Sequence, residues 1–244
     1  MAVLLAAGLT FWTLYRIKAG KTYQLREIAG LKAIEEAIGR ATEMGRSILF
    51  TPGYGGDIQR PTTIASMSFL SAVAEKTARY DCRLIYPTHD PIIMATAQEI
   101  VSQQYTIAGH PERYNADDIH YLSSSQFAYA AGVEGEIMRE RPASVFLLGT
   151  FEAEALIMAE TAASVGAIQI AGTDSTIQLS FFIIACDYTL IGEELFAASG
   201  YLSGNPGALA SIWAQDLMRI LCGLFIVAGL LSVFLFPDSQ WWKL

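Results

Sequence analysis

The chain has 244 residues, of which 52% are hydrophobic and 16% are charged, whereas about 25% are charged in typical soluble domains. Its formal net charge is −8, and residues 142–218 hold eight acidic side chains but no Lys or Arg. Because such a surface repels phosphate backbones, the composition argues against nucleic acid as a partner.

The first predicted element is an apolar run over residues 2–15. Positive charge follows this run, at Arg16, Lys18, Lys21 and Arg26, whereas a secretory signal carries it in front. Since cytoplasmic flanks collect Lys and Arg, residues 1–19 are expected to be a transmembrane anchor with its N-terminus outside. Fourteen apolar residues are few for a full span, so the bilayer would thin locally or further residues would precede the run.

Helix and strand patterns alternate between residues 20 and 207. Strands are predicted at 47–51, 82–86, 144–148, 167–171 and 179–186. Helices are predicted at 31–44, 62–79, 91–108, 126–140, 152–165 and 190–202. This alternation predicts a cytoplasmic α/β domain with a Rossmann-like, mostly parallel sheet covered by helices. The short turn 172–176 leaves no room for a helix between the last two predicted strands, so an antiparallel edge or a small irregular element is expected there.

The last predicted element is a stalk and transmembrane helix over residues 208–237. Residues 220–236 carry no charge and span about 26 Å, close to the hydrocarbon thickness of a bilayer. Pro237 ends this helix, and Trp241 and Trp242 in the short outer tail 238–244 fit an interfacial aromatic belt. Arg219 precedes the apolar segment, so both anchors predict a cytoplasmic domain over residues 16–219 and both termini outside.

The cysteines and histidines lie singly along the chain, at Cys82, Cys186, Cys222, His89, His110 and His120. No C-x-x-C spacing occurs and no two histidines are four residues apart, so neither a disulfide framework nor a zinc site is indicated. No G-x-S-x-G elbow occurs either, and no catalytic residue is assigned.

A glycine-rich corner at residues 51–57 follows a predicted strand and precedes a helix. Its glycines can bring backbone N–H groups against a phosphate. The spacing matches neither a Walker loop nor G-x-G-x-x-G, and Asp57 adds a repelling charge, so a plain turn is the favoured alternative. With two threonines near other strand ends, the candidate ligand-binding residues are Gly53, Gly55, Gly56, Thr150 and Thr189.

Acidic side chains gather at two further corners, after the predicted strands 144–148 and 179–186. They are hard oxygen ligands of the kind that Mg²⁺ or Ca²⁺ prefers, and one of them can also serve as a general base. Alternatively, they complement helix dipoles, worth about 0.3–1 kcal/mol each, and pair with arginines such as Arg40 or Arg46. If the two strands are neighbours, their ends lie about 5 Å apart and the acids share one crevice. The candidate metal ligands are Glu152, Glu154, Asp187, Glu193 and Glu194.

Two stretches, residues 35–45 (EEAIGRATEMG) and 186–197 (CDYTLIGEELFA), resemble those of an uncharacterised family of bacterial membrane-anchored proteins, catalogued as a domain of unknown function. The resemblance covers most of the predicted domain and its anchors. It implies no activity, cofactor or catalytic residue.

Two functions from different classes fit these patterns. The leading one is a structural or accessory subunit of a homo-oligomeric or larger membrane complex, with the α/β domain as its interaction module. The bilayer, further copies of the chain or other membrane subunits would be its partners. The alternative is a ligand- or divalent-cation-binding domain, or an enzyme, that uses the acidic corners. No cofactor is expected apart from Mg²⁺ or Ca²⁺ there.

Overall fold

The computed structural model describes residues 2–19 and 29–235. Their contacts divide the chain into an α/β unit, Arg26–Ser203, and a helical unit that joins Met1–Leu25 to Gly204–Leu244. The predicted outer tail and the cations Lys21 and Arg26 lie outside the described residues.

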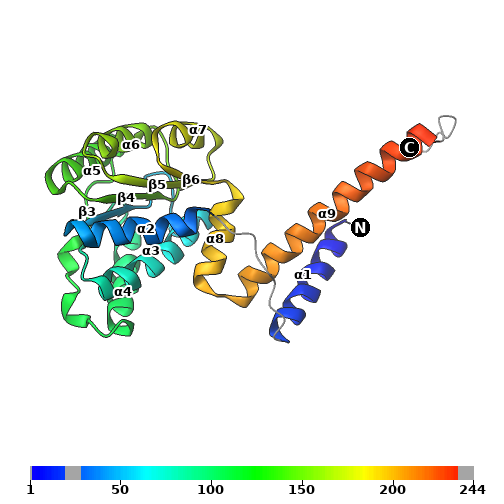
Figure 1. The fold of residues 1–244 in the computed structure, drawn as a ribbon, viewed down its shortest axis with the longest axis horizontal. Helices are drawn as coiled ribbons and strands as arrows, with labels where there is room; N and C mark the ends of the chain where they lie inside the picture. The colour runs from blue at the N-terminus through cyan, green and yellow to red at the C-terminus, as the bar shows by residue number, and fades with distance from the viewer. Residues whose placement is uncertain (1, 20–28, 236–244) are drawn as a thin grey trace. The chain divides into compact units, whose positions relative to one another are not determined.

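The α/β unit alternates helices and strands along its whole length. In chain order they are α2 (Ala29–Met44), β1 (Ile48–Thr51), α3 (Pro61–Tyr80), β2 (Leu84–Thr88), α4 (Pro91–Ile107), the 3₁₀ turns η1 (Pro111–Arg113) and η2 (Ala116–Asp118), β3 (Ile119–Tyr121), α5 (Gln126–Glu140), β4 (Ser144–Leu148), α6 (Glu154–Ser164), β5 (Ile168–Thr173), α7 (Thr176–Ala185), β6 (Tyr188–Ile191) and α8 (Glu193–Ser203). The six strands form one parallel sheet in the order β3-β2-β1-β4-β5-β6 (Figure 1). The predicted Rossmann-like α/β fold is confirmed.

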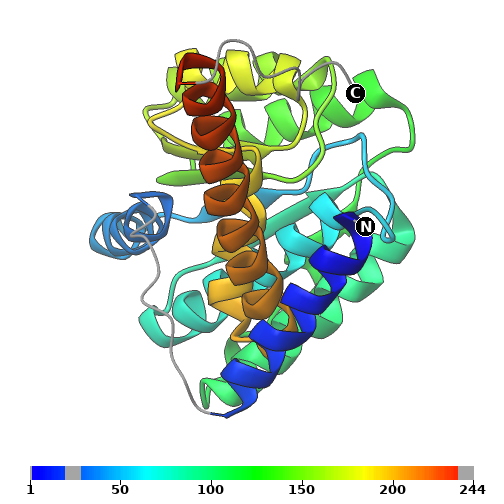
Figure 2. The same cartoon turned by 90° about the vertical axis from the view of Figure 1, so that its right-hand side faces the viewer.

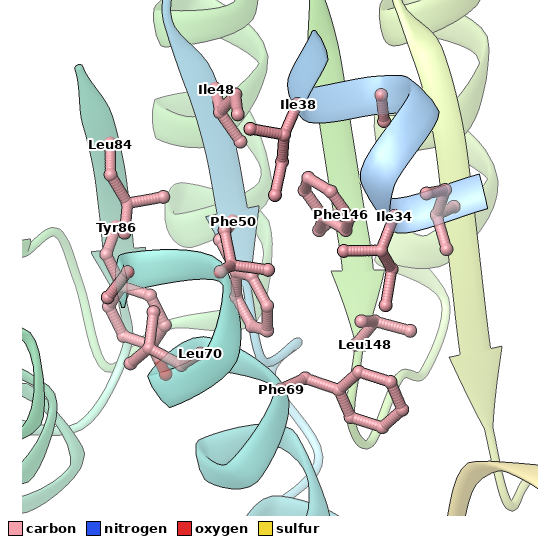
Figure 3. Close-up of a cluster of buried hydrophobic side chains, with 14 of the residues drawn as sticks. Ile34, Ile38, Ile48, Phe50, Phe69, Leu70, Leu84, Tyr86, Phe146 and Leu148 are labelled. Atoms are coloured by element: carbon pink, nitrogen blue, oxygen red, sulfur yellow. The ribbon is translucent and has the colours of Figure 1, made fainter. Parts of the chain in front are cut away.

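The central strands are mostly apolar because helices cover both faces of the sheet. Every residue of β1, β2, β4 and β5 is buried. Helices α2, α3, α4 and α8 cover one face, and α5, α6 and α7 cover the other (Figure 1). On the first face, Phe50 stacks between Tyr86 and Phe146 at centroid distances of 5.7 and 5.9 Å, under Ile34 and Ile38 of α2 (Figure 3).

Capping residues determine the start of α4 and the end of α5, both at the positions predicted from the sequence. The Asp90 side chain caps α4 by accepting hydrogen bonds from the backbone N–H groups of Ile92 and Ile93, at 2.6 and 3.1 Å, and Pro91 is the first helical residue. Helix α5 ends where Arg141 takes a left-handed conformation, directly before Pro142.

The prediction of a strand at residues 179–186 is wrong, because residues 179–185 belong to helix α7 and Cys186 directly follows it. The next strand, β6, is parallel to β5, and a parallel connection needs a crossover that returns the chain to the other end of the sheet. The apolar run supplies that crossover, so there is no antiparallel edge. Strand β6 also replaces the start of the helix predicted at 190–202, and the short strand β3 was not predicted.

The helical unit contains α1 (Ala2–Lys18) and α9 (Pro206–Leu235), which lie side by side (Figures 1 and 2). The Thr13 hydroxyl donates to the carbonyl of Ala210 at 3.0 Å. The Arg16 guanidinium lies 4.8 Å from the ring centroid of Trp12 and 5.6 Å from that of Trp213. These contacts join the C-terminal end of α1 to the first turns of α9.

One helix in the described residues, Pro206–Ser232, is long and apolar enough to cross a membrane. Its second half is exposed, with Phe225 at 78% and Leu230 at 67%. The N-terminal helix is 17 residues long and does not meet the same measure. The expectation of one transmembrane helix at each end is therefore supported only at the C-terminal side.

Candidate functional site

The carboxyl ends of β1 and β4 mark the point where the strand order reverses, which in open α/β sheets is where ligands bind. Two loops meet there, residues 52–60 after β1 and residues 149–153 after β4. They contain four of the five predicted ligand-binding residues. The fifth, Thr189, lies within β6 opposite Ala171 of β5, so it is not part of this corner.

The two loops are joined backbone to backbone. The Gly55 N–H donates to the carbonyl of Thr150, and the Thr150 N–H donates to the carbonyl of Pro52, both at 3.0 Å. A Cβ on Gly53 (φ +78°) would lie 2.2 Å from the Thr150 oxygen, and one on Gly149 (φ +153°) 2.1 Å from the Pro52 oxygen. These glycines therefore allow one loop to contact the other.

Two buried hydroxyl groups without partners lie beneath Gly56. A Cβ on Gly56 would lie 2.4 Å from the Thr63 hydroxyl and 3.1 Å from the Thr150 hydroxyl. Thr63 is 1% exposed and Thr150 is 3% exposed, and neither hydroxyl has a hydrogen-bond partner in the described part of the chain. An unsatisfied buried hydroxyl costs about 1–3 kcal/mol, so a polar atom placed beside these two hydroxyls would be stabilised by hydrogen bonds to them.

Glu154 is fully buried and ties three segments together. Its Oε1 accepts from the N–H groups of Tyr54 and Glu152, each at 3.0 Å, and its Oε2 accepts from the Gln126 amide at 2.8 Å. The same amide lies 3.2 Å from Oε2 of the exposed Glu152. Neutral donors thus satisfy Glu154, where the sequence led us to expect an ion or an arginine. Arg46, one of the two arginines considered, donates instead to the Arg141 carbonyl at 2.6 Å.

An aromatic group that the sequence did not reveal borders the β1 loop. The His89 ring lies 4.9 Å from the Tyr54 ring and 5.7 Å from the Tyr129 ring, between centroids. The Tyr129 hydroxyl is hydrogen-bonded to the Thr51 hydroxyl. Burial lowers the pKa of His89, although Asp90 and the backbone of Gly53 oppose the shift. His89 is therefore favoured as a neutral imidazole, and its position just after β2 was the signal that could have indicated it.

The predicted acidic crevice does not form as expected. Asp187 precedes β6, so it lies at the amino ends of the strands, whereas Glu152 follows the carboxyl end of β4. The Asp187 carboxylate accepts from the Gln169 N–H at 2.8 Å. Glu193 and Glu194 follow β6, and the Glu194 carboxylate accepts from the Ile191 N–H at 3.3 Å. The error follows from the wrong strand at 179–186. Among the described residues, no three His, Cys, Asp or Glu side chains are grouped so that they could hold one metal ion.

A cavity of about 310 Å³ lies at the amino end of β2, whereas the β1/β4 corner lies at the carboxyl ends of the strands. Its charges are paired internally, since Arg83 donates to Asp118 at 2.7 and 2.9 Å and to Glu140 at 2.9 Å. Burial, and secondarily the charge of Asp81, raises the pKa of the Cys82 thiol to about 11. A neutral thiol is a poor nucleophile, so the cavity does not displace the β1/β4 corner as the candidate site.

A family model described as "Domain of unknown function (DUF6754)" matches residues 1–240 of the chain. We find no match among curated proteins and none among solved structures.

Proposed function

The chain belongs to the DUF6754 family, and from this premise we propose that it is a membrane-anchored interaction module, acting as an accessory subunit of a homo-oligomeric or larger membrane complex. The observation that carries the proposal is the second half of α9, which is apolar and exposed, with Ile220, Leu224, Phe225 and Leu230 all at 60% or more. Lipid or other membrane helices are the surroundings that suit such a surface.

The two units are joined by a short connection. Helix α8 ends at Ser203 and α9 begins at Pro206, so two residues separate them. The proposed topology places both termini outside and residues 16–219 in the cytoplasm. Its support is the position of Arg16 and Lys18 in the last turn of α1 and of Arg219 before the apolar part of α9.

The mass of the particle tests the proposal. In mild detergent, we expect the full chain extracted from its native membrane to migrate in a particle heavier than one copy. The proposal also predicts weak association through the membrane helix alone, because Gly223 and Gly229 do not form a G-x-x-x-G pair. A clean monomer over a wide concentration range would remove the proposal.

A second candidate function is the binding of a small ligand or a divalent cation at the β1/β4 corner. The unpartnered hydroxyls of Thr63 and Thr150 favour it, together with the exposed carboxylate of Glu152 close to Gly55. If Mg²⁺ or Ca²⁺ binds there, an ion concentration of about one hundred times Kd stabilises the fold by about 2.7 kcal/mol.

Thermal unfolding of the solubilised chain with and without each ion tests this second candidate. The Glu152→Gln variant should lose the ion-dependent shift of the unfolding temperature. The control Glu160→Gln, which changes an exposed glutamate on the following helix α6, should keep this shift. An unchanged transition with both ions removes the cation version.

A further inference from the structure

Helix α7 presents an apolar face to the surroundings of the α/β unit. It is ten residues long and contains no charged side chain. Phe182 is fully buried and packs edge-on against Phe151 at a centroid distance of 5.1 Å. On the outer side, Ile177 is 69% exposed and Ile184 is 87% exposed. The helix lies at one end of the upper helical layer, next to α6 (Figure 1).

The outer side chains of α7 form one surface. Ile177, Phe181 and Ile184 are spaced four and three residues apart, so they share one side of the helix. Ile183 is also exposed, about 100° around the helix from Ile184, and so is Ile157 of the neighbouring helix α6. We call the group Ile157, Ile177, Phe181, Ile183 and Ile184 the α7 face. Exposed apolar side chains concentrated on one helix and its neighbour are typical of an interaction site.

A bilayer does not fit the α7 face. Ten residues of helix extend about 15 Å, half of the hydrocarbon thickness, so α7 cannot span a membrane. Helices that lie on a membrane surface carry Lys and Arg on their polar side. Residues 142–218 contain no Lys or Arg, and anionic headgroups would repel the surrounding acids.

The same charges decide which protein surface fits. Every charged residue on α6, β5, α7, β6, α8 and the loops that join them is acidic. Asp174 precedes α7 and Asp187 follows it, and Glu160 is exposed on α6. Arg60, from outside these elements, comes within 3.9 Å of Asp174. Two copies that met through this face would bring acids against acids, whereas a basic border would be complementary.

We propose that the α7 face binds a different protein, through an apolar surface bordered by Lys and Arg. This assignment rests on the proposed function, and it specifies which surface binds the partner and what chemistry the partner's surface has. Its apolar centre is Ile177, Phe181 and Ile184. Of the nearby acids, Glu160 lies one helical turn after Ile157 on α6, and Asp187 follows the end of α7. The partner's basic residues would speed its association and set its orientation, and the isoleucines would exclude water.

Photo-crosslinking in the native membrane tests this assignment. A photoreactive phenylalanine analogue replaces Ile184 in the full chain, and a matched control places it at Ile92, a 62% exposed isoleucine on α4. We expect an adduct from position 184 with a peptide of another protein in which Lys or Arg flank apolar residues. Position 92 should give little of it. Glu160→Lys should lower the yield severalfold, and so should a rise from low to physiological salt.

Four results would overturn the assignment: an adduct with lipid, with α1 or α9, or with residues 176–185 of a second copy, or a yield no higher than at position 92. Thermal unfolding of the Ile184 variant shows whether the fold is kept. If it is not, the same analogue at Ile177 replaces it. If the particle is heavier than a monomer but neither position 184 nor position 177 gives an adduct, the assignment of the α7 face is wrong and the proposed function still stands. A monomer removes both.

Discussion

At Gly53 and Gly149 the lack of a side chain sets how closely the β1 and β4 loops approach each other. Each glycine has a positive φ, and an added Cβ would meet a backbone oxygen of the other loop at 2.2 or 2.1 Å. Backbone oxygens cannot rotate away as the end of a flexible side chain can. The corner is therefore held in one geometry by residue identity at two positions.

Gly53→Ala should destabilise the fold by at least about 2 kcal/mol, because it adds a steric clash to an unfavourable backbone conformation. Gly135→Ala is the matched control, since Gly135 lies in α5 with nothing within 4 Å of its added Cβ. There the change should stabilise by up to about 1 kcal/mol. Thermal or denaturant unfolding measures both, and equal stability of the two variants would contradict the clash.

His120 and Glu136 should make stability depend on pH. The His120 Nε2 contacts the buried Glu136 carboxylate, and its Nδ1 lies 3.1 Å from the Asp117 carbonyl. The hydrogen bond with Glu136 raises the pKa of His120, against the opposing effect of burial. A histidine whose pKa is raised in the folded state stabilises fully below its unfolded pKa of about 6.5. That contribution is lost as the pH rises through the folded pKa.

Unfolding of the wild type and of His120→Gln, compared from about pH 5.5 to about pH 8.5, measures this contribution. The stability advantage of the wild type should shrink as the pH rises. Glu136→Gln should remove the same pH dependence, because it takes away the carboxylate that favours the imidazolium. A constant difference between wild type and His120→Gln would show that the pair does not titrate in this range.

The sequence predicted part of this corner for a physical reason. Gly53, Gly55, Gly56 and Thr150 follow two strands, and parallel strands bring their carboxyl ends to one edge. Gln126, Tyr129 and His89 come from α5 and the end of β2, and no spacing along the chain marks them as neighbours of the β1 loop. Their contribution depends on strand order, which a single sequence does not specify.

At the scale of elements, α7 shows where periodicity fails. A short run of Phe and Ile looks alike in a buried strand and in a helix. Topology distinguishes the two, because a parallel sheet that continues from β5 to β6 needs a crossover between them. Residues 174–187, which lie between β5 and β6, are the only residues that can form this crossover. Asp174 and Ser175, which precede the helix, are also common residues at helix starts.

The two sides of α7 should respond differently to truncation. Phe182→Ala removes a fully buried ring from the contact with Phe151 and should cost about 3–5 kcal/mol. Ile184→Ala removes an 87% exposed side chain and should change stability by no more than about 0.5 kcal/mol. Denaturant unfolding of the solubilised chain measures both, and similar losses would mean that the exposed side is covered in solution.

At the scale of the whole molecule, the proposed topology can be tested by reporters that are active only outside the cytoplasm. A reporter fused after Leu244 should be active, and one inserted after the exposed Asn115, between η1 and η2, should be silent. The reason is the excess of Lys and Arg on the side of the apolar segments that faces the domain. An active reporter at the internal site, or an inactive one at the C-terminus, would contradict the proposed orientation.

The pairing of α1 with α9 also determines when the molecule can be completed during synthesis. Thr13 and its acceptor Ala210 are 197 residues apart, and a ribosome adds about 5–20 residues per second. Helix α1 therefore waits about 10 to 40 seconds for the helix that it packs against. Throughout that interval Trp12 and Thr13, which contact Trp213 and Ala210 of α9 in the complete chain, meet whatever surrounds the nascent chain. The α/β unit ends with α8 at Ser203, so its synthesis is complete before Ala210 is added.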